Sequence, residues 1–166
     1  MARAARRAGF ANVEVLRWGE QRQPTRNLSV CSVPGERIVG MRTNIYVLTS
    51  GETSVFVGTE ARGLAAIDHV AKDHRVDIAV LPVNGMRLLG RPLVMDAPTA
   101  LSAARRLGAS TFVPIHYSQL PIPRLLKPHS TLADLSVGEQ NGTPRIAVIA
   151  PSTRTVIRSS TPPRQT

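Results

Sequence analysis

Two short apolar segments constrain the fold of this chain more than any other feature. Residues 76–83 read VDIAVLPV, and residues 110–115 read STFVPI. Short apolar runs of this kind are typical of buried strands in parallel sheets. Between them, APTALSAARRLG predicts a helix, with Asp96 as N-cap, Pro98 in the first turn and Gly108 as the stop. This order predicts two strands that pair in parallel, with a helix packed on the sheet.

The remaining residues predict further strands and two more helices. Helix-forming residues at 2–8 end at Gly9, a natural helix stop. An amphipathic period predicts a helix over 61–74. Alternation predicts the earlier strands, which are 12–18, 27–33 (closed by Pro34-Gly35), 44–50 and 53–58, the last two as a hairpin around Gly51-Glu52.

The length of 166 residues predicts one domain. We place this domain at residues 1–150 and expect 151–166 to contain a final strand and a disordered basic tail. Residues 145–150 and 154–159 predict a closing hairpin. The glycine-bearing segment 85–92 and the proline-broken segment 121–130 are predicted to be loops, although a short helix is an alternative for the second.

The composition is basic, with 21 Lys and Arg against 11 Asp and Glu and a formal charge of +10. The arginines are scattered and aromatic residues are only 4%, which favours a general surface composition over nucleic-acid binding. The single cysteine, Cys31, excludes a disulfide framework and a cysteine-based zinc site. No apolar run approaches the ~20 residues of a membrane span, and the amino terminus lacks a secretory signal pattern. A cytoplasmic location is therefore expected.

One family accounts for the order of these segments. The segments NIYVLTSGETSVFVGTEA, VDIAVLPVNG and LVMDAPTALSAARRLGASTFVPIHY resemble the carboxyl-terminal half of a metallo-β-lactamase-fold hydrolase, closest to the ascorbate-phosphate-lactonase-like branch. ARRAGFANVEVLRWGE and LSVCSVPGERIVGMRTN resemble the family's middle. The resemblance implies an α/β fold, namely a partial αββα sandwich whose mixed sheet carries helices on one side. One sheet face would then be apolar and exposed. Either a second copy or a partner chain would cover this face, or the chain would be marginally stable.

The resemblance also implies a metal. The family's active site resembles an open zinc site whose bound water attacks an ester, lactone, amide or phosphodiester. Its leading ligands come from a His-x-His-x-Asp-His motif, which none of the four histidines forms, so the chain is expected to begin after that motif. Whether the chain is a shortened gene product stays open. An aspartate that begins the family's buried strand is structural, so Asp77 is expected to bond nearby backbone.

Three later ligand positions of the family fall within this sequence. The histidine after the family's vPa falls on Glu36 or Arg37, and the bridging aspartate falls on Thr59, with Glu60 beside it. The last histidine falls on His116. Since Arg37 is always charged and cannot bind a cation, the candidate metal ligands are His116, Glu60 and Glu36. A hydrolytic zinc site needs about three protein ligands, so we expect zinc to be absent or weakly bound.

Two functions from different classes follow. The first is a metallo-β-lactamase-like hydrolase relative whose metal site is degenerate and which does not hydrolyse substrates on its own. The alternative is a non-catalytic module that binds an anionic ligand or a partner chain, with Tyr117, Arg87 and Arg91 as candidate ligand-binding residues. In a third hypothesis, a partner chain supplies the missing ligands of an active hydrolase. The sequence leaves open whether the chain is an enzyme.

Overall fold

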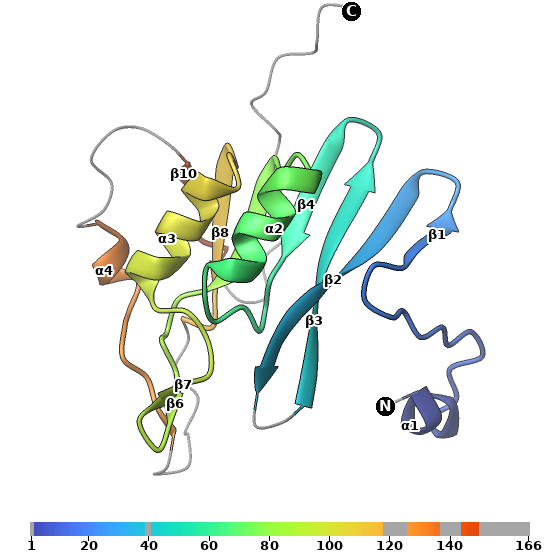
Figure 1. Ribbon diagram of the computed structural model, residues 1–166, viewed down its shortest axis with the longest axis horizontal. Coiled ribbons are helices and arrows are strands. Elements are labelled where there is room, and N and C mark those ends of the chain that lie inside the picture. Colours follow the sequence, from blue (N-terminus) through green and yellow to red (C-terminus); the bar gives the residue numbers. More distant parts are fainter. Residues whose placement is uncertain (1, 39–40, 118–125, 137–143, 150–166) are drawn as a thin grey trace, which may run out of the picture.

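The computed structural model describes residues 2–38, 41–117, 126–136 and 144–149 (Figure 1). The helices are α1 (Ala2–Arg7), α2 (Ala65–Asp73), α3 (Ala97–Arg106) and α4 (Ala133–Ser136). The strands are β1 (Gln21–Thr25), β2 (Leu28–Ile38), β3 (Met41–Ser50), β4 (Thr53–Val57), β5 (Ile78–Pro82), β6 (Arg87–Leu88), β7 (Arg91–Pro92), β8 (Thr111–Ile115), β9 (Leu126–Lys127) and β10 (Arg145–Ile146). The described part of the chain contains no helix long and apolar enough to cross a bilayer.

A mixed sheet of seven strands forms the centre of the fold. Its order is β1-β2-β3-β4-β5-β8-β10. Neighbours from β1 to β4 are antiparallel, whereas β4, β5, β8 and β10 run parallel. Ala79 of β5 lies opposite Phe112 of β8, so the predicted parallel pair is confirmed. The predicted hairpin of β3 and β4 is also confirmed, and it turns at Gly51 with φ +57.

Helices cover one face of this sheet. Figure 1 shows α2 and α3 side by side in front of the parallel strands, and α3 contacts β5 and β8. The core between these layers is built from alternate residues of each strand and from the inner stripes of the two helices. Its largest members are Phe56, Phe112, Ile45, Ile67, Leu81, Met95 and Val70, all of them fully buried.

The opposite sheet face consists of the other alternate residues. Leu48 of β3 lies opposite Val55 of β4, and Val80 of β5 lies opposite Val113 of β8. Leu48, Val55 and Val80 are only half-buried, and none of them belongs to the core cluster. The described helices α2 and α3 both contact the sheet from the other side. This face therefore remains apolar and partly open among the residues that the structure describes.

The caps of α3 are formed as the sequence predicts. Oδ1 of Asp96 accepts a hydrogen bond from the backbone N–H of Thr99 at 3.0 Å, which satisfies one of the free donors at the helix start. Gly108 follows the helix with φ +68, a left-handed conformation that glycine adopts at little cost. The described sequence also contains one helix that the residue pattern did not predict, the four-residue α4.

Several predicted boundaries are wrong for identifiable reasons. Residues 12–18 are irregular, and their backbone is held by a side chain, since Nδ2 of Asn44 donates to the carbonyl of Leu16 at 3.4 Å. Strand β2 does not stop at Pro34 but passes a register shift there and continues to Ile38. Gly35 permits this path, because an added Cβ would come within 2.6 Å of the carbonyl oxygen of Thr43.

The second helix and the predicted loops also differ from expectation. Helix α2 begins at Ala65, because the residues before it form a turn in which Ala61 N–H donates to the carbonyl of Gly58. Residues 87–92 form a hairpin instead of a loop, and β9 joins it as a third strand. Strand β10 pairs in parallel with β8. Its predicted hairpin partner at 154–159, the tail and residues 121–125 lie outside the described residues.

Candidate functional site

Four strands of the sheet end at the same edge. Strands β2 and β4 both run antiparallel to β3, and β5 and β8 run parallel to β4. Near the carboxyl ends of these strands lie Glu36, Thr59 with Glu60, Val83 and His116. We call this the carboxyl edge, and it lies at the lower end of Figure 1. Ligand sites in open α/β sheets form beyond the carboxyl ends of parallel strands.

The carboxylate of Glu36 forms an ion pair at this edge. Nε of Arg62 lies 2.5 Å from Oε2 of Glu36, and the two side chains are 35% and 22% exposed, respectively. The main chain of Glu36 is held as well, since the hydroxyl of Thr43 donates to its carbonyl at 2.6 Å. Gly63 leaves room for the carboxylate, because a Cβ there would lie 2.6 Å from Oε1. The local structure is thus shaped around the Glu36–Arg62 pair.

This pairing bears directly on Glu36 as a candidate metal ligand. A carboxylate that a guanidinium already binds has fewer free lone pairs for a cation. The positive charge of Arg62 also opposes a second cation at the same place. Arg62 is a residue that sequence analysis missed. Its partner lies 26 positions earlier in the chain, so no local pattern links the two.

Thr59 and Glu60 lie in the turn that follows β4 and are half-buried. Two backbone bonds hold this turn, one from Gly58 N–H to the carbonyl of Val80 at 2.9 Å and one from Ala61 N–H to the carbonyl of Gly58 at 3.0 Å. Both residues therefore lie at the carboxyl edge. The structure records no hydrogen bond or ion pair between the Glu60 carboxylate and another described side chain.

His116 ends β8 in an uncommon conformation. Its φ is +59, and its side chain is exposed. A left-handed backbone costs an L-residue roughly 1 kcal/mol, although histidine is found there more often than most residues. The carbonyl of Ile115, directly before it, accepts a hydrogen bond from Val83 N–H at 3.1 Å. The parallel pairing of β5 and β8 thus brings His116 to the edge that also holds Glu36 and Glu60.

The candidate ligands do not form a metal-binding group. Within the described residues, no three or more His, Cys, Asp or Glu side chains lie close enough to hold one ion. A catalytic zinc site requires about three such ligands and an open position. The donor set of the described chain therefore does not fit the zinc that the resemblance implies, and no reaction step through a metal follows from it.

The three candidate ligand-binding residues do not converge on one cavity. In the small sheet β7-β6-β9, Arg87 lies opposite Pro92 and Lys127, whereas Arg91 lies opposite Leu88. Opposed residues share a face and adjacent positions alternate, so Arg87 and Arg91 project from opposite faces. The hydroxyl of Tyr117 donates to the carbonyl of Ile149, and its ring packs against the core.

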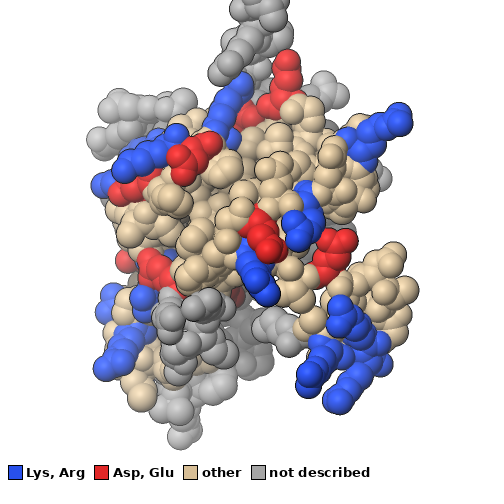
Figure 2. All heavy atoms as spheres, turned by 45° about the vertical axis from the view of Figure 1, so that its right-hand side comes forward, with Lys and Arg blue, Asp and Glu red and all other residues tan. Residues whose placement is uncertain are grey.

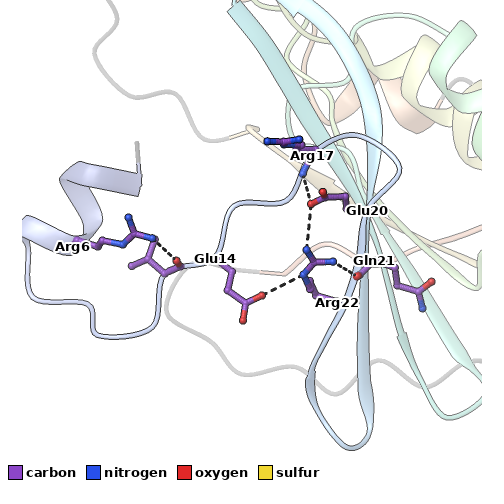
Figure 3. A network of polar contacts seen from close by, with 7 residues as sticks. Arg6, Glu14, Arg17, Glu20, Gln21 and Arg22 are labelled. Carbon is purple, nitrogen blue, oxygen red and sulfur yellow. Dashed lines mark hydrogen bonds and ion pairs between the residues drawn. The ribbon is translucent and has the colours of Figure 1, made fainter.

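A hollow lies near the amino terminus, where no site was predicted. It has a volume of about 400 Å³ and is lined by Leu16, Arg17, Trp18 and Asn44. The indole N–H of Trp18 donates to Oδ1 of Asn44 at 2.9 Å. A polar network supports this wall (Figure 3), in which Arg22 bridges Glu14 and Glu20 at 3.6 Å each. Arg17 and Arg22 are exposed, so these contacts position the segment without enclosing a deep site.

Comparison with known proteins decides the fold. No family model matches the chain. A UPF0173 metal-dependent hydrolase of Shouchella clausii is 31% identical over 100 residues, which are 60% of this chain and 40% of the relative. The metallo-β-lactamase fold protein YhfI of Bacillus subtilis superposes with a TM-score of 0.58 at 11% identity, over 82% of this chain and 52% of that protein. The chain has a partial metallo-β-lactamase fold.

Two further solved structures share this metallo-β-lactamase fold. An isothiocyanate hydrolase from Delia radicum gut bacteria has a TM-score of 0.75 at 17% identity, over 95% of this chain and 64% of that one. Igni18, a metallo hydrolase from Ignicoccus hospitalis, has a TM-score of 0.66 at 16% identity, over 89% and 61%. At such low identities the likeness concerns the fold alone. The chain spans 40% of the length of its curated relative.

Proposed function

We propose that this chain is a metallo-β-lactamase-fold relative in which an ion pair has replaced part of the metal site, so that the chain alone does not carry out metal-dependent hydrolysis. The observation that carries the proposal is the 2.5 Å contact between Glu36 and Arg62. Glu36 is one of the two residues, with Arg37, on which the resemblance places a metal-binding histidine. The curated relative is named a metal-dependent hydrolase. In this proposal, the chain differs from that relative in its metal site and not in its fold.

The physical argument is one of charge and ligand number. In a hydrolytic zinc site, the double charge of the ion lowers the pKa of bound water, and several neutral or anionic ligands hold the ion there. Here a fixed guanidinium supplies the positive charge and already binds the carboxylate at this place. It cross-links the ends of β2 and of the loop after β4, which is a mechanical role that a bound metal would otherwise fill. A guanidinium cannot activate water as a Lewis acid does.

Metal content tests this proposal. The protein is purified without chelators, and bound zinc, iron and manganese are measured per chain by mass spectrometry. We expect far less than one metal per chain. We also expect no turnover of an ester, a lactone or a phosphodiester when zinc or manganese is added.

Two variants make the test selective. Arg62→Ala frees the Glu36 carboxylate, and His116→Ala removes the one imidazole at the family's ligand position. Metal content should stay low in both, because three ligands do not converge in either. Near-stoichiometric metal that disappears in His116→Ala would overturn the proposal.

A second candidate, an interaction module, is favoured by the open sheet face. From Leu28 to Pro34 of β2, from Asn44 to Ser50 of β3, and along β4, β5 and β8, this face carries no charged residue. We propose that a second copy of the chain covers it. Two chains of charge +10 repel each other, and they approach with least repulsion through an uncharged surface. The two sheets would pack face to face at about 10 Å, with helices on both outer sides.

Molecular mass in solution tests this candidate. We expect a dimer by light scattering, and we expect Leu48→Lys to make it a monomer, because the variant would bury two unpaired charges in the interface. Thr49→Lys, the next residue, projects from the other face and adds the same charge, so it should leave the dimer intact. Circular dichroism checks that both variants fold. A monomeric parent protein at every concentration would refute the self-association.

A further inference from the structure

The hairpin at the carboxyl edge has an unusual turn. Strands β6 and β7 pair with Leu88 opposite Arg91, which leaves a two-residue loop of Leu89 and Gly90. Their φ values are +49 and +80. Positive φ at both positions defines a type I′ turn, whose preferred sequences are Asn-Gly, Asp-Gly and Gly-Gly. Gly90 suits its place, but Leu89 is a bulky residue where the turn favours asparagine or glycine.

The side chain of Leu89 gains nothing from packing within the described chain. It is 78% exposed, the most open of the large apolar residues in that part of the molecule. Neither turn chemistry nor burial therefore accounts for leucine at the tip. An apolar group that is held out on a strained turn is explained if its contact lies outside the molecule.

Cationic residues flank this apolar tip on both sides. Arg87 and Lys127 share one face of the three-stranded sheet β7-β6-β9, and Arg91 projects from the other. Residues 85–93, GMRLLGRPL, contain no acid. Charges on opposite faces cannot bind one small anion together. They can all reach a flat anionic surface that the hairpin approaches tip first.

A second basic element lies at the same end of the molecule. Helix α1 has no acidic residue and carries exposed Arg3, Arg6 and Arg7, and Phe10 after it is 66% exposed. Figure 1 shows α1 and the hairpin at the lower end of the view, on either side of the carboxyl edge. In Figure 2, Lys and Arg atoms gather at the lower right and the lower left. The same combination of cations and an exposed apolar side chain thus occurs twice.

We propose that this end of the molecule docks onto an anionic lipid bilayer. Leu89 enters the boundary between headgroups and acyl chains, where apolar side chains gain free energy by leaving water. Arg87, Arg91 and Lys127 then meet lipid phosphates at the surface. Nucleic acid fits less well, because an aliphatic tip cannot stack on bases as aromatic side chains do. Such docking would turn the carboxyl edge toward the membrane.

Vesicle sedimentation with one substitution at the tip tests the proposal. The full chain is mixed with vesicles of phosphatidylcholine alone, or of phosphatidylcholine with phosphatidylglycerol, and bound protein is measured over a range of salt. We expect binding to the anionic vesicles only, weakening as salt rises. Leu89→Asn should weaken this binding at least about tenfold. Since Asn-Gly is a preferred type I′ pair, the variant should melt no lower than the parent protein.

Matched charge variants separate local from overall electrostatics. Arg87→Gln with Arg91→Gln should weaken vesicle binding roughly twenty-five-fold, about fivefold per cation. Arg26→Gln with Lys72→Gln removes the same charge at the other end of the sheet, because these residues precede β2 and β5. This control should change binding much less.

Three outcomes would overturn the proposal. One is equal binding of Leu89→Asn and the parent protein to anionic vesicles. Another is equal loss of binding in the two double variants, which would make the attraction a matter of net charge alone. The third is tighter binding to duplex DNA than to the anionic vesicles at the same salt concentration, unaffected by Leu89→Asn.

Discussion

The two ends of the central sheet are built differently. At the end where β4, β5 and β8 begin, which we call the amino edge, Asp77 is 2% exposed. Its Oδ2 accepts from Ser54 N–H and its Oδ1 from Arg75, both at 2.8 Å, and its carbonyl accepts from Ser110 and Thr111 N–H. At the carboxyl edge stand a part-exposed ion pair and a left-handed, exposed His116. The amino edge thus joins β4, β5 and β8 through buried polar groups whose hydrogen bonds are formed. The carboxyl edge has no such connection among its described residues.

The contrast shows what each end does. Buried polar groups with complete hydrogen bonding fix a structure, so the amino edge serves to hold the parallel strands in register. Strained backbone and half-exposed charges concentrate where proteins contact ligands. The carboxyl edge thus has features that occur where proteins contact ligands, although its described residues do not assemble a metal site. The following predictions test this difference, beginning with the largest expected effect.

Removal of the Asp77 side chain should destabilise the protein most. Asp77→Ala leaves the buried N–H of Ser54 without its acceptor and deprives Arg75 of its partner. We expect a loss of about 3 kcal/mol in the free energy of unfolding, measured by urea titration. Asp77→Asn is the matched control, since it keeps an acceptor for Ser54 and should lose about half as much. A cost below about 1 kcal/mol for Asp77→Ala would show that the amino edge is not held by this residue.

At the carboxyl edge, the Glu36–Arg62 pair should contribute less. A double-mutant cycle with Glu36→Ala and Arg62→Ala should give a coupling energy of about 1 kcal/mol, because both side chains are partly solvated. Urea titration of the four proteins measures it. A coupling as large as the Asp77 effect would erase the difference between the two edges.

Gly63 offers an independent check on the same pair. Gly63→Ala places a Cβ 2.6 Å from Oε1 of Glu36 and should force the carboxylate to move. We expect a cost of about 1 kcal/mol in the parent protein, and a smaller one when Glu36 is already alanine. Equal costs in the two backgrounds would mean that the Glu36 carboxylate does not occupy this space.

Relief of the backbone strain at His116 should give a small gain in stability. His116→Gly removes the Cβ that disfavours φ +59 but makes the unfolded chain more flexible, so we expect a net stabilisation of about 0.5 kcal/mol. His116→Ala keeps a Cβ and should be less stable than the parent protein by a similar amount. Thermal unfolding compares the three proteins. Destabilisation by glycine would reveal stabilising contacts of the imidazole.

The smallest expected effect concerns Asp134 of α4. The backbone N–H of Thr131, and next the hydroxyl of Ser130, donate to this carboxylate and lower its pKa below the ordinary value of 3.8. A lowered folded pKa means that the stabilisation is present above pH 3.8 and is lost as pH falls through the folded pKa. An NMR titration of the carboxyl carbon measures it. Ser130→Ala should raise the pKa, and an unchanged pKa in that variant would contradict the assigned cause.

Much of the fold follows from local patterns. The apolar run at 76–83 and the capped helix from Asp96 to Gly108 are self-sufficient signals, because burial and capping act over neighbouring residues. The expectation that Asp77 bonds nearby backbone is confirmed by its contact with Ser54. The strand predicted at 12–18 is wrong, because the side chain of Asn44 binds its backbone from far along the chain. The candidate metal ligands could be identified from the sequence, but whether their side chains lie close together could not.

The sequence alone determined the strand–helix–strand unit, the mixed sheet with helices on one side and the positions of His116, Glu36 and Glu60 along the chain. Only the tertiary structure decided that Glu36 meets Arg62, that Arg87 and Arg91 face apart, and that Leu89 stands exposed on a type I′ turn. The reason is physical. Periodicity and caps arise from residues a few positions apart, whereas an ion pair, a sheet register and the exposure of a tip depend on which distant segments meet.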